Sequence, residues 1–273
     1  MITFSRRRLI NALVGLSICG LLGVLLHLGQ TAFHNPQWFS GWLLVFMTLF
    51  LMVYNLRKKL SFIPLGSNAI WLQLHIYAGL VTGFLFLLHI GWQLSDGAFG
   101  LALTLVFGGV CLVGVIGIIL SRALSRQLSQ HGEQLIFERI PGFARTIQAE
   151  AEAVILESVE KTDSTTLADI YSATLAQHFM NPPRSIGYLI RSKRYLFELH
   201  NELAAQERFM NDDERSYSNQ IRALIHQRHD LDSQYAIQAL LKSWLFIHIP
   251  LSYSALLMVM VHVTLVYAFG AVS

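Results

Sequence analysis

The sequence predicts an all-α fold: a polytopic membrane bundle of five transmembrane helices with a helical cytoplasmic insertion between the fourth and the fifth. The first observation is composition, since 53% of the 273 residues are hydrophobic and only 14% are charged, against roughly a quarter in ordinary globular proteins. The second is that apolar residues form runs close to the about 20 residues that a membrane-crossing helix needs. The third is that most charged residues fall between 122 and 240. We therefore divide the chain into residues 1–121 (spans one to four), 122–240 (the insertion) and 241–273 (span five).

Five apolar runs have the length that a transmembrane helix requires. The first follows three arginines, Arg6 to Arg8, and has the position of a secretory signal peptide. Its apolar run is longer than the core of a signal peptide, and no small-residue cleavage site of the A-x-A kind follows it. We therefore expect a retained membrane helix there. The expected spans cover residues 9–29, 39–56, 69–93, 99–121 and 243–269.

The distribution of positive charge predicts the orientation of the helices. All twenty Lys and Arg residues lie before the first span, after the second, or between the fourth and the fifth. Lys and Arg concentrate on the cytoplasmic side of membrane proteins. The N-terminus is therefore expected in the cytoplasm and the C-terminus in the periplasm, with the chain in the inner (cytoplasmic) membrane. Spans three and five then run in the same direction, from inside to outside.

The insertion is predicted to be helical throughout. Residues 163–166 (Asp-Ser-Thr-Thr) have the turn and capping chemistry that begins a helix. Asn181-Pro182-Pro183 ends that helix, because proline cannot continue the hydrogen-bond ladder. The insertion contains no GxGxxG and no GKS or GKT sequence, so a nucleotide-binding domain is not expected. The expected helices cover residues 143–161, 167–180, 186–209 and 212–240, and the last is expected to run directly into span five.

Two histidine pairs distinguish the apolar spans. His75 and His89 lie fourteen residues apart in span three, and His248 and His262 repeat that interval in span five. Fourteen helical residues rise ~21 Å and return to within ~40° of the same face, so each span presents one imidazole near each side of the membrane. Because the spans are parallel, His75 and His248 are expected at the cytoplasmic level, and His89 and His262 at the outer level. Ionisable residues inside a membrane usually carry function, and histidine is an axial ligand of haem iron. These four residues are the predicted ligands of two haem b groups.

Small residues lie between the histidines on both helices. They include Gly83 in span three and Ser252 and Ala255 in span five. Small side chains leave room for a flat macrocycle, but they suit close helix packing equally well, so both interpretations stay open. Pro250 is expected to remove one backbone hydrogen bond and to kink span five near His248.

The remaining histidines give weaker signals. His27 and His34 are expected at the outer surface, where a solvated role is favoured over haem-propionate binding or proton transfer. His226 and His229 precede two aspartates with a spacing compatible with a metal site. Histidines are ordinary on a polar helix, and we favour that interpretation. The sequence identifies no partner for His131, His178 and His200.

With these histidines, the spans resemble the membrane domain of ferric reductases and NADPH oxidases, in which spans three and five each carry a histidine pair and together bind two haems. They are also similar to the paired-helix arrangement in the cytochrome b of quinol-oxidising complexes. The resemblance covers the spans and not the insertion, and it includes neither the sixth span nor the flavin and nicotinamide domain usual in the ferric reductase group. It implies an inner haem on His75 and His248 and an outer haem on His89 and His262.

The function expected from this resemblance is single-electron transfer across the membrane, as an electron-transfer subunit of an oxidoreductase complex. Besides membrane lipid, a redox partner is expected on at least one side: a c-type cytochrome, a flavoprotein, an iron–sulfur subunit or quinone. No nucleic acid is expected among the partners.

Two other classes of function stay open. A membrane-anchored scaffold or signalling protein would bind a partner through the insertion, but it leaves the four matched histidines unexplained. A transporter would use the histidines as a proton or metal path, although such proteins often have carboxylates inside their spans and no Asp or Glu lies inside any span here.

Overall fold

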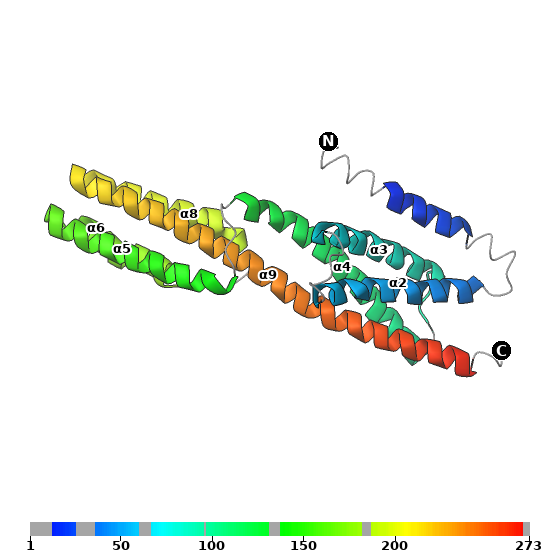
Figure 1. The fold of residues 1–273 in the computed structure, drawn as a ribbon. Coiled ribbons are helices and arrows are strands. Elements are labelled where there is room, and N and C mark those ends of the chain that lie inside the picture. Colours follow the sequence, from blue (N-terminus) through cyan, green and yellow to red (C-terminus); the bar gives the residue numbers. More distant parts are fainter. Residues whose placement is uncertain are drawn as a thin grey trace. The chain divides into compact units, whose positions relative to one another are not determined.

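The computed structural model consists of helices, which confirms the predicted all-α class for the residues that it describes (Figure 1). It divides into two compact units: Met1–Ile119 with Trp244–Ser273, and Leu120–Ser243. The boundaries between the units fall within two long helices, α4 (Ala98–Gln130) and α9 (Asp212–Phe269). The described residues are 13–25, 36–59, 67–95, 97–130, 137–181 and 187–269.

The first unit contains long apolar helices. α2 (Pro36–Lys59), α3 (Asn68–His89), α4 and α9 each include a stretch long and apolar enough to cross a membrane. These four helices indicate a multi-pass membrane protein and confirm predicted spans two to five as apolar helices. A shorter apolar helix covers Leu13–Leu25, and the rest of predicted span 9–29 lies outside the described residues.

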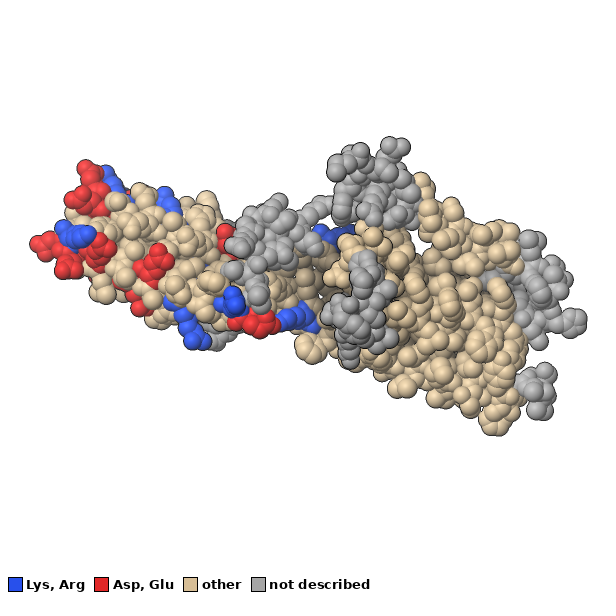
Figure 2. Space-filling model, in the orientation of Figure 1, with Lys and Arg blue, Asp and Glu red and all other residues tan. Residues whose placement is uncertain are grey.

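Charge distinguishes the two units. None of the described side chains of the first unit belongs to Lys, Arg, Asp or Glu, and those visible in Figure 2 are all tan. The blue and red side chains in that view belong to the second unit. Because a charged side chain is costly inside a bilayer, the first unit is the part suited to a lipid environment.

A Schellman motif ends α3 immediately after His89. The amide of Gly91 donates to the carbonyl of Leu88 at 3.2 Å, and the amide of Trp92 donates to the carbonyl of Leu87 at 3.2 Å. Gly91 has a φ of 61°, the left-handed conformation that glycine adopts without steric cost. The predicted span extends four residues too far, because the turn at Gly91 closes the helix at His89.

The first unit has a small core to which four helices contribute. On α3 the buried residues include Thr82 and Phe86, and on α9 they include Ala255 and Val259. The ring of Phe86 stacks on that of Phe107 of α4, with 4.6 Å between centroids. The stretches between the histidines of α3 and α9 therefore both contribute to the interior of this unit. The core cluster comprises Leu44, Leu85, Phe86, Phe107, Ala255 and Val259.

Glycines of α4 allow a close approach of α9. The indole of Trp244 lies against Gly117, where an added Cβ would overlap the ring. The indole Nε1 donates to the backbone carbonyl of Val113 at 2.9 Å. An added Cβ on Gly109 would lie 3.6 Å from Leu251. Close helix packing is therefore what these glycines of α4 provide.

The helices of the second unit follow the predicted order. α5 (Ile140–Thr162) is followed by a turn in which Asp163 has a left-handed φ of 50°. α8 (Gly187–Gln206) and a short 3₁₀ turn precede α9. α9 is one helix through to Phe269, and Pro250 does not interrupt it. The prediction that the last helix of the insertion runs directly into span five is confirmed.

The helix predicted at 167–180 contains a π-helical turn. It consists of α6 (Thr166–Ile170), the π turn (Tyr171–Leu175) and α7 (Ala176–Met180). Four fully or almost fully buried side chains of this segment recur every four residues, which exceeds the 3.6-residue period of an α-helix. A π turn is wider than an α turn, so it keeps these side chains on one face. They are Leu167, Tyr171, Leu175 and Phe179.

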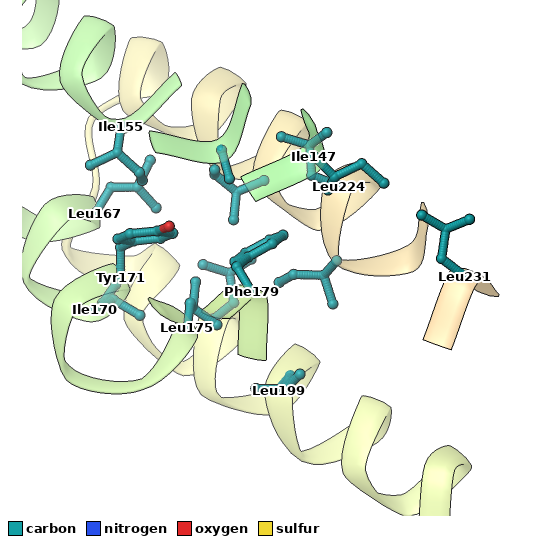
Figure 3. Packing of buried hydrophobic residues seen from close by; sticks show 14 of the residues in the cluster. Ile147, Ile155, Leu167, Ile170, Tyr171, Leu175, Phe179, Leu199, Leu224 and Leu231 are labelled. Atoms are coloured by element: carbon teal, nitrogen blue, oxygen red, sulfur yellow. The ribbon is translucent and has the colours of Figure 1, made fainter. Parts of the chain in front are cut away.

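Tyr171 and Phe179 lie within the core of the second unit, with their ring centroids 5.9 Å apart. They point toward Ile147 and Ile155 of α5 and toward Leu224 of α9 (Figure 3). Burial of a large apolar side chain stabilises a fold by about 1.5–3 kcal/mol. This cluster therefore holds the helices of the second unit together.

A buried carboxylate connects the beginning of α9 to the beginning of α6. Glu214 is fully buried; its Oε1 accepts a hydrogen bond from the amide of Leu167 at 2.9 Å, and its Oε2 accepts one from the hydroxyl of Ser164 at 3.0 Å. The first amides of a helix have no partner within that helix. The sequence predicts a local cap here, but the N-cap residue Thr165 makes no side-chain capping bond. A distant glutamate supplies the cap instead.

Candidate functional site

His89 lies at the end of α3 against α2. Its Nδ1 is 2.9 Å from the hydroxyl oxygen of Ser40. Ser40 is only 4% exposed, and its hydroxyl donates to the backbone carbonyl of Gln37 at 3.1 Å. Next to it, an added Cβ on Gly41 would lie 3.3 Å from Cε1 of the imidazole. Ser40 and Gly41 therefore hold one edge of the His89 ring, from Nδ1 to Cε1.

His262 of α9 lies within electrostatic reach of His89, and both side chains are half-buried. α2 also contacts α9 near this level, because the ring of Tyr267 packs edge-on against Trp38 and Trp42, with centroid distances of 5.2 and 6.2 Å. α2 thus contacts both histidine-bearing helices. Of the predicted outer pair, His89 contacts α2 through Ser40, and His262 lies on α9, which α2 also contacts.

The two residues predicted as the inner pair contact different helices. The ring of His75 packs against Tyr54 of α2, with 4.9 Å between centroids and 32° between planes. The ring of His248 stacks on Trp244, with 5.1 Å between centroids and 14° between planes. The Cε1 atom of His248 would lie 3.8 Å from a Cβ added to Gly114 of α4. His75 is therefore held from α2, and His248 is held from its own helix and α4.

The small residues between the histidine levels serve helix packing. An added Cβ on Gly83 would lie 3.5 Å from the Sγ of Cys111 on α4. Ala255 is part of the buried core and is 3% exposed. Both positions take part in helix packing, and room for a macrocycle stays a prediction.

The second unit contains a buried polar cluster that sequence reasoning missed. Arg228 and Asp232, one turn apart on α9, form an ion pair at 3.1 Å with side chains 3% and 5% exposed. Arg228 also donates to the carbonyl of Asn181 at 3.3 Å. His178 of α7 is almost fully buried, and its ring packs against Tyr195 of α8 with 5.5 Å between centroids. The Arg228–Asp232 spacing is a detectable helix pairing signal, whereas nothing near His178 in the sequence indicates its partners.

Two histidine rings of the second unit lie close together. The rings of His200 of α8 and His226 of α9 lie 4.5 Å apart. Arg222 acts electrostatically on His200, and a nearby cation disfavours binding of a metal cation. Across the described parts of the chain, no group of three or more His, Cys, Asp or Glu side chains is arranged to hold a metal ion. Three histidines considered above lie outside the described residues: His27, His34 and His131.

Two groups of the buried polar cluster make opposite contributions to the pH dependence of stability. Burial, with a smaller contribution from Arg228, lowers the pKa of His178 to about 4. Burial raises the pKa of Asp232, which lies in the charged part of α9, to about 7 despite the opposing effect of Arg228. Between pH 6.5 and 4, the unfolded chain protonates His178 more readily than the folded chain does, so acidification costs stability through His178. Over the same range the folded chain retains a proton on Asp232 that the unfolded chain loses, so acidification adds stability through Asp232.

In the wild type, the effects of His178 and Asp232 on the pH dependence of stability oppose each other. We expect His178→Phe to remove the first effect and leave that of Asp232. The free energy of unfolding of the second unit should then rise as the pH falls from 7 to 4.5. The difference from wild type should change by about 3 kcal/mol over this range, because one pKa unit corresponds to about 1.4 kcal/mol. Hydrogen–deuterium exchange of α5 and α9 amides in the full chain, corrected for intrinsic exchange rates, measures the effect.

Phe197→Leu is the control for this measurement, because Phe197 is an exposed residue of the second unit that does not titrate. It should leave the pH dependence of unfolding unchanged. A His178→Phe protein with the pH dependence of the wild type would contradict the assignment of opposite titrations.

No protein-family model, curated protein or solved structure matches this chain. The chain is therefore described as an all-helical protein with four long apolar helices that could cross a membrane.

Proposed function

We propose that this chain is a di-haem b-type cytochrome of the membrane, which carries single electrons across the bilayer as a subunit of an oxidoreductase complex. The observation that carries the proposal is the outer histidine pair. His89 and His262 belong to two apolar helices that both contact α2, and they occupy a unit whose described side chains include no Lys, Arg, Asp or Glu. In this proposal they would hold an outer haem, and His75 and His248 would hold an inner haem.

The residues present suit ligation by histidine. A ligating imidazole normally donates a hydrogen bond from the N–H of its second ring nitrogen to a neighbouring acceptor. For Nδ1 of His89, the hydroxyl oxygen of Ser40 lies where such an acceptor is needed. At the inner level, Nδ1 of His248 is buried and has no hydrogen-bond partner among the described residues. Because buried polar atoms are usually satisfied, this nitrogen is available to a further group.

A haem held by two histidines would supply single-electron transfer and no oxygen or substrate chemistry. The role of the chain is then to orient the imidazoles and to exclude water. Ser40 and Gly41 orient His89, and Trp244 orients His248 by stacking. Phe86 supplies part of the apolar interior of the first unit.

Partners are part of the same proposal. The partner on the inner side is a cytoplasmic flavoprotein, an iron–sulfur subunit or membrane quinone, and the partner on the outer side, as acceptor or donor, is a protein such as a c-type cytochrome. The second unit supports a docking role, because it has its own core and carries side chains of both charges on its surface (Figure 2). Complementary charge of this kind steers encounters between partner proteins.

Haem quantification tests the proposal. Protein purified from cells supplied with a haem precursor should contain about two non-covalent haems per chain, with the reduced-minus-oxidised spectrum of a b-type cytochrome. A pyridine-haemochrome assay combined with quantitative amino-acid analysis measures the ratio. Folded, monodisperse protein that contains no haem and takes up none on titration would overturn the proposal. That result would favour the membrane-anchored scaffold instead.

A further inference from the structure

The geometry points to Ser40 as a positioning residue that fixes the tautomer and the orientation of His89. The inference rests on the proposed function where it concerns haem, since it describes how His89 presents a ligand nitrogen. It concerns a residue of α2, the helix to which the sequence assigned no part of the site.

The tautomer follows from the two contacts of the Ser40 hydroxyl. A hydroxyl has one proton to donate and two lone pairs with which to accept. The carbonyl oxygen of Gln37, 3.1 Å away, can only accept, and Nδ1 of His89 lies 2.9 Å from the same hydroxyl. Both contacts are hydrogen bonds only if Ser40 donates to Gln37 and accepts from a protonated Nδ1. A neutral imidazole has one ring proton, so Nε2 of His89 then presents its lone pair.

Local structure holds this arrangement in place. Ser40 is 4% exposed, so water competes little for either hydrogen bond. Gly41 provides the space beside Cε1 of the imidazole, which a side chain would crowd. The left-handed turn at Gly91 makes His89 the last residue of α3. The ring is thus fixed both by its own helix end and by the facing surface of α2.

A haem ligand benefits from such a bond in two ways. The acceptor orients the ring, and it raises the basicity of the ligating nitrogen. Loss of an outer partner of this kind typically weakens metal binding about 10–100-fold. We therefore expect Ser40→Ala to weaken retention of the outer haem by that factor. The midpoint potential of the outer haem should become more positive in this variant, because a less basic imidazole stabilises ferric iron less.

The experiment has one arm without haem and one with it. In the first, full-length protein labelled with ¹⁵N-histidine and prepared without haem is examined by NMR. The His89 resonance is assigned by its loss in His89→Ala. Wild type should show a protonated Nδ1, and Ser40→Ala should show a different tautomer population. In the second arm, redox titration of the haem-loaded variants follows the outer and inner components separately.

Two further variants separate positioning from structural damage. Ser40→Thr keeps the hydroxyl and should restore the wild-type tautomer and outer potential. Thr48→Ala removes another buried hydroxyl of α2, which donates to the carbonyl of Leu44 at 2.8 Å, and it should change neither readout. An equally large shift in Thr48→Ala would overturn the inference, because the effect would then come from α2 as a whole.

The outcomes distinguish this inference from the proposed function. A wild-type His89 without a proton on Nδ1, or a haem-loaded Ser40→Ala protein with an unchanged outer component, would overturn the positioning role and leave the proposed function intact. Protein that binds no haem but has a protonated Nδ1 that depends on Ser40 would overturn the proposed function and support the positioning role.

Discussion

Under the proposed function, replacing His89 or His262 by alanine should remove the same haem, leaving about half of the total haem in either variant. The double variant should lose no more than each single variant, because one haem depends on both ligands. His75→Ala and His248→Ala should remove the other half in the same manner. Haem quantification and redox titration of each purified variant measure which spectral component disappears.

His226→Ala is the matched control for the histidine series, because it removes an exposed histidine of the second unit. It should retain the full haem content and both spectral components. If His89→Ala and His248→Ala removed the same component, the assignment of His89 with His262 would be wrong. The predicted parallel direction of spans three and five would then be wrong as well.

Arg228→Met should destabilise the second unit by about 3–5 kcal/mol, because it leaves the carboxylate of Asp232 buried without its charged partner. The side chains of this pair are 3% and 5% exposed, so solvent cannot replace the lost interaction. The effect should be largest at pH 8, above the pKa of Asp232, which burial raises to about 7. Hydrogen exchange of α5 and α7 amides in the full chain reports the loss of stability.

An exposed pair provides the comparison. Arg194 and Glu198 are 2.8 Å apart with side chains 85% and 57% exposed, and Arg194→Met should cost less than about 1 kcal/mol. The double variant Arg228→Met with Asp232→Leu should recover most of the lost stability, because an apolar pair avoids the desolvation of both charges. A double variant as unstable as Arg228→Met alone would show that packing, and not the unpaired charge, sets the cost.

Most helices could be predicted because their signals are local. Long apolar runs marked the membrane helices, and Asn181-Pro182-Pro183 marked the end of α7. The end of α3 was placed too late because Ile90 and Trp92, which lie within the Schellman turn, continue the apolar run. The four-residue repeat that begins at Leu167 was present in the sequence, and it is a readable sign of the π turn. The cap from Glu214 was not predictable, because it depends on packing between distant segments.

The candidate site was predictable only along each helix. The fourteen-residue interval identifies the histidines without any knowledge of packing. Which helix faces each ring is a tertiary property, and α2 was not expected to contact His89 through Ser40. The association of His248 with α4 was equally inaccessible, because the glycines of α4 gave no indication of their partner helix.

The hydrogen bond from the indole of Trp244 to the backbone carbonyl of Val113 has a consequence for biosynthesis. These residues are 131 positions apart in the chain, and a ribosome needs on the order of ten seconds to synthesise that length. During this interval α4 has no Trp244 to cover Gly117, and the core residues of α3 have no Ala255 or Val259 to pack against. The first unit can therefore be completed only after the second unit has been translated. Any group held between α3 and α9 would be captured at that late stage, when the last span enters the membrane.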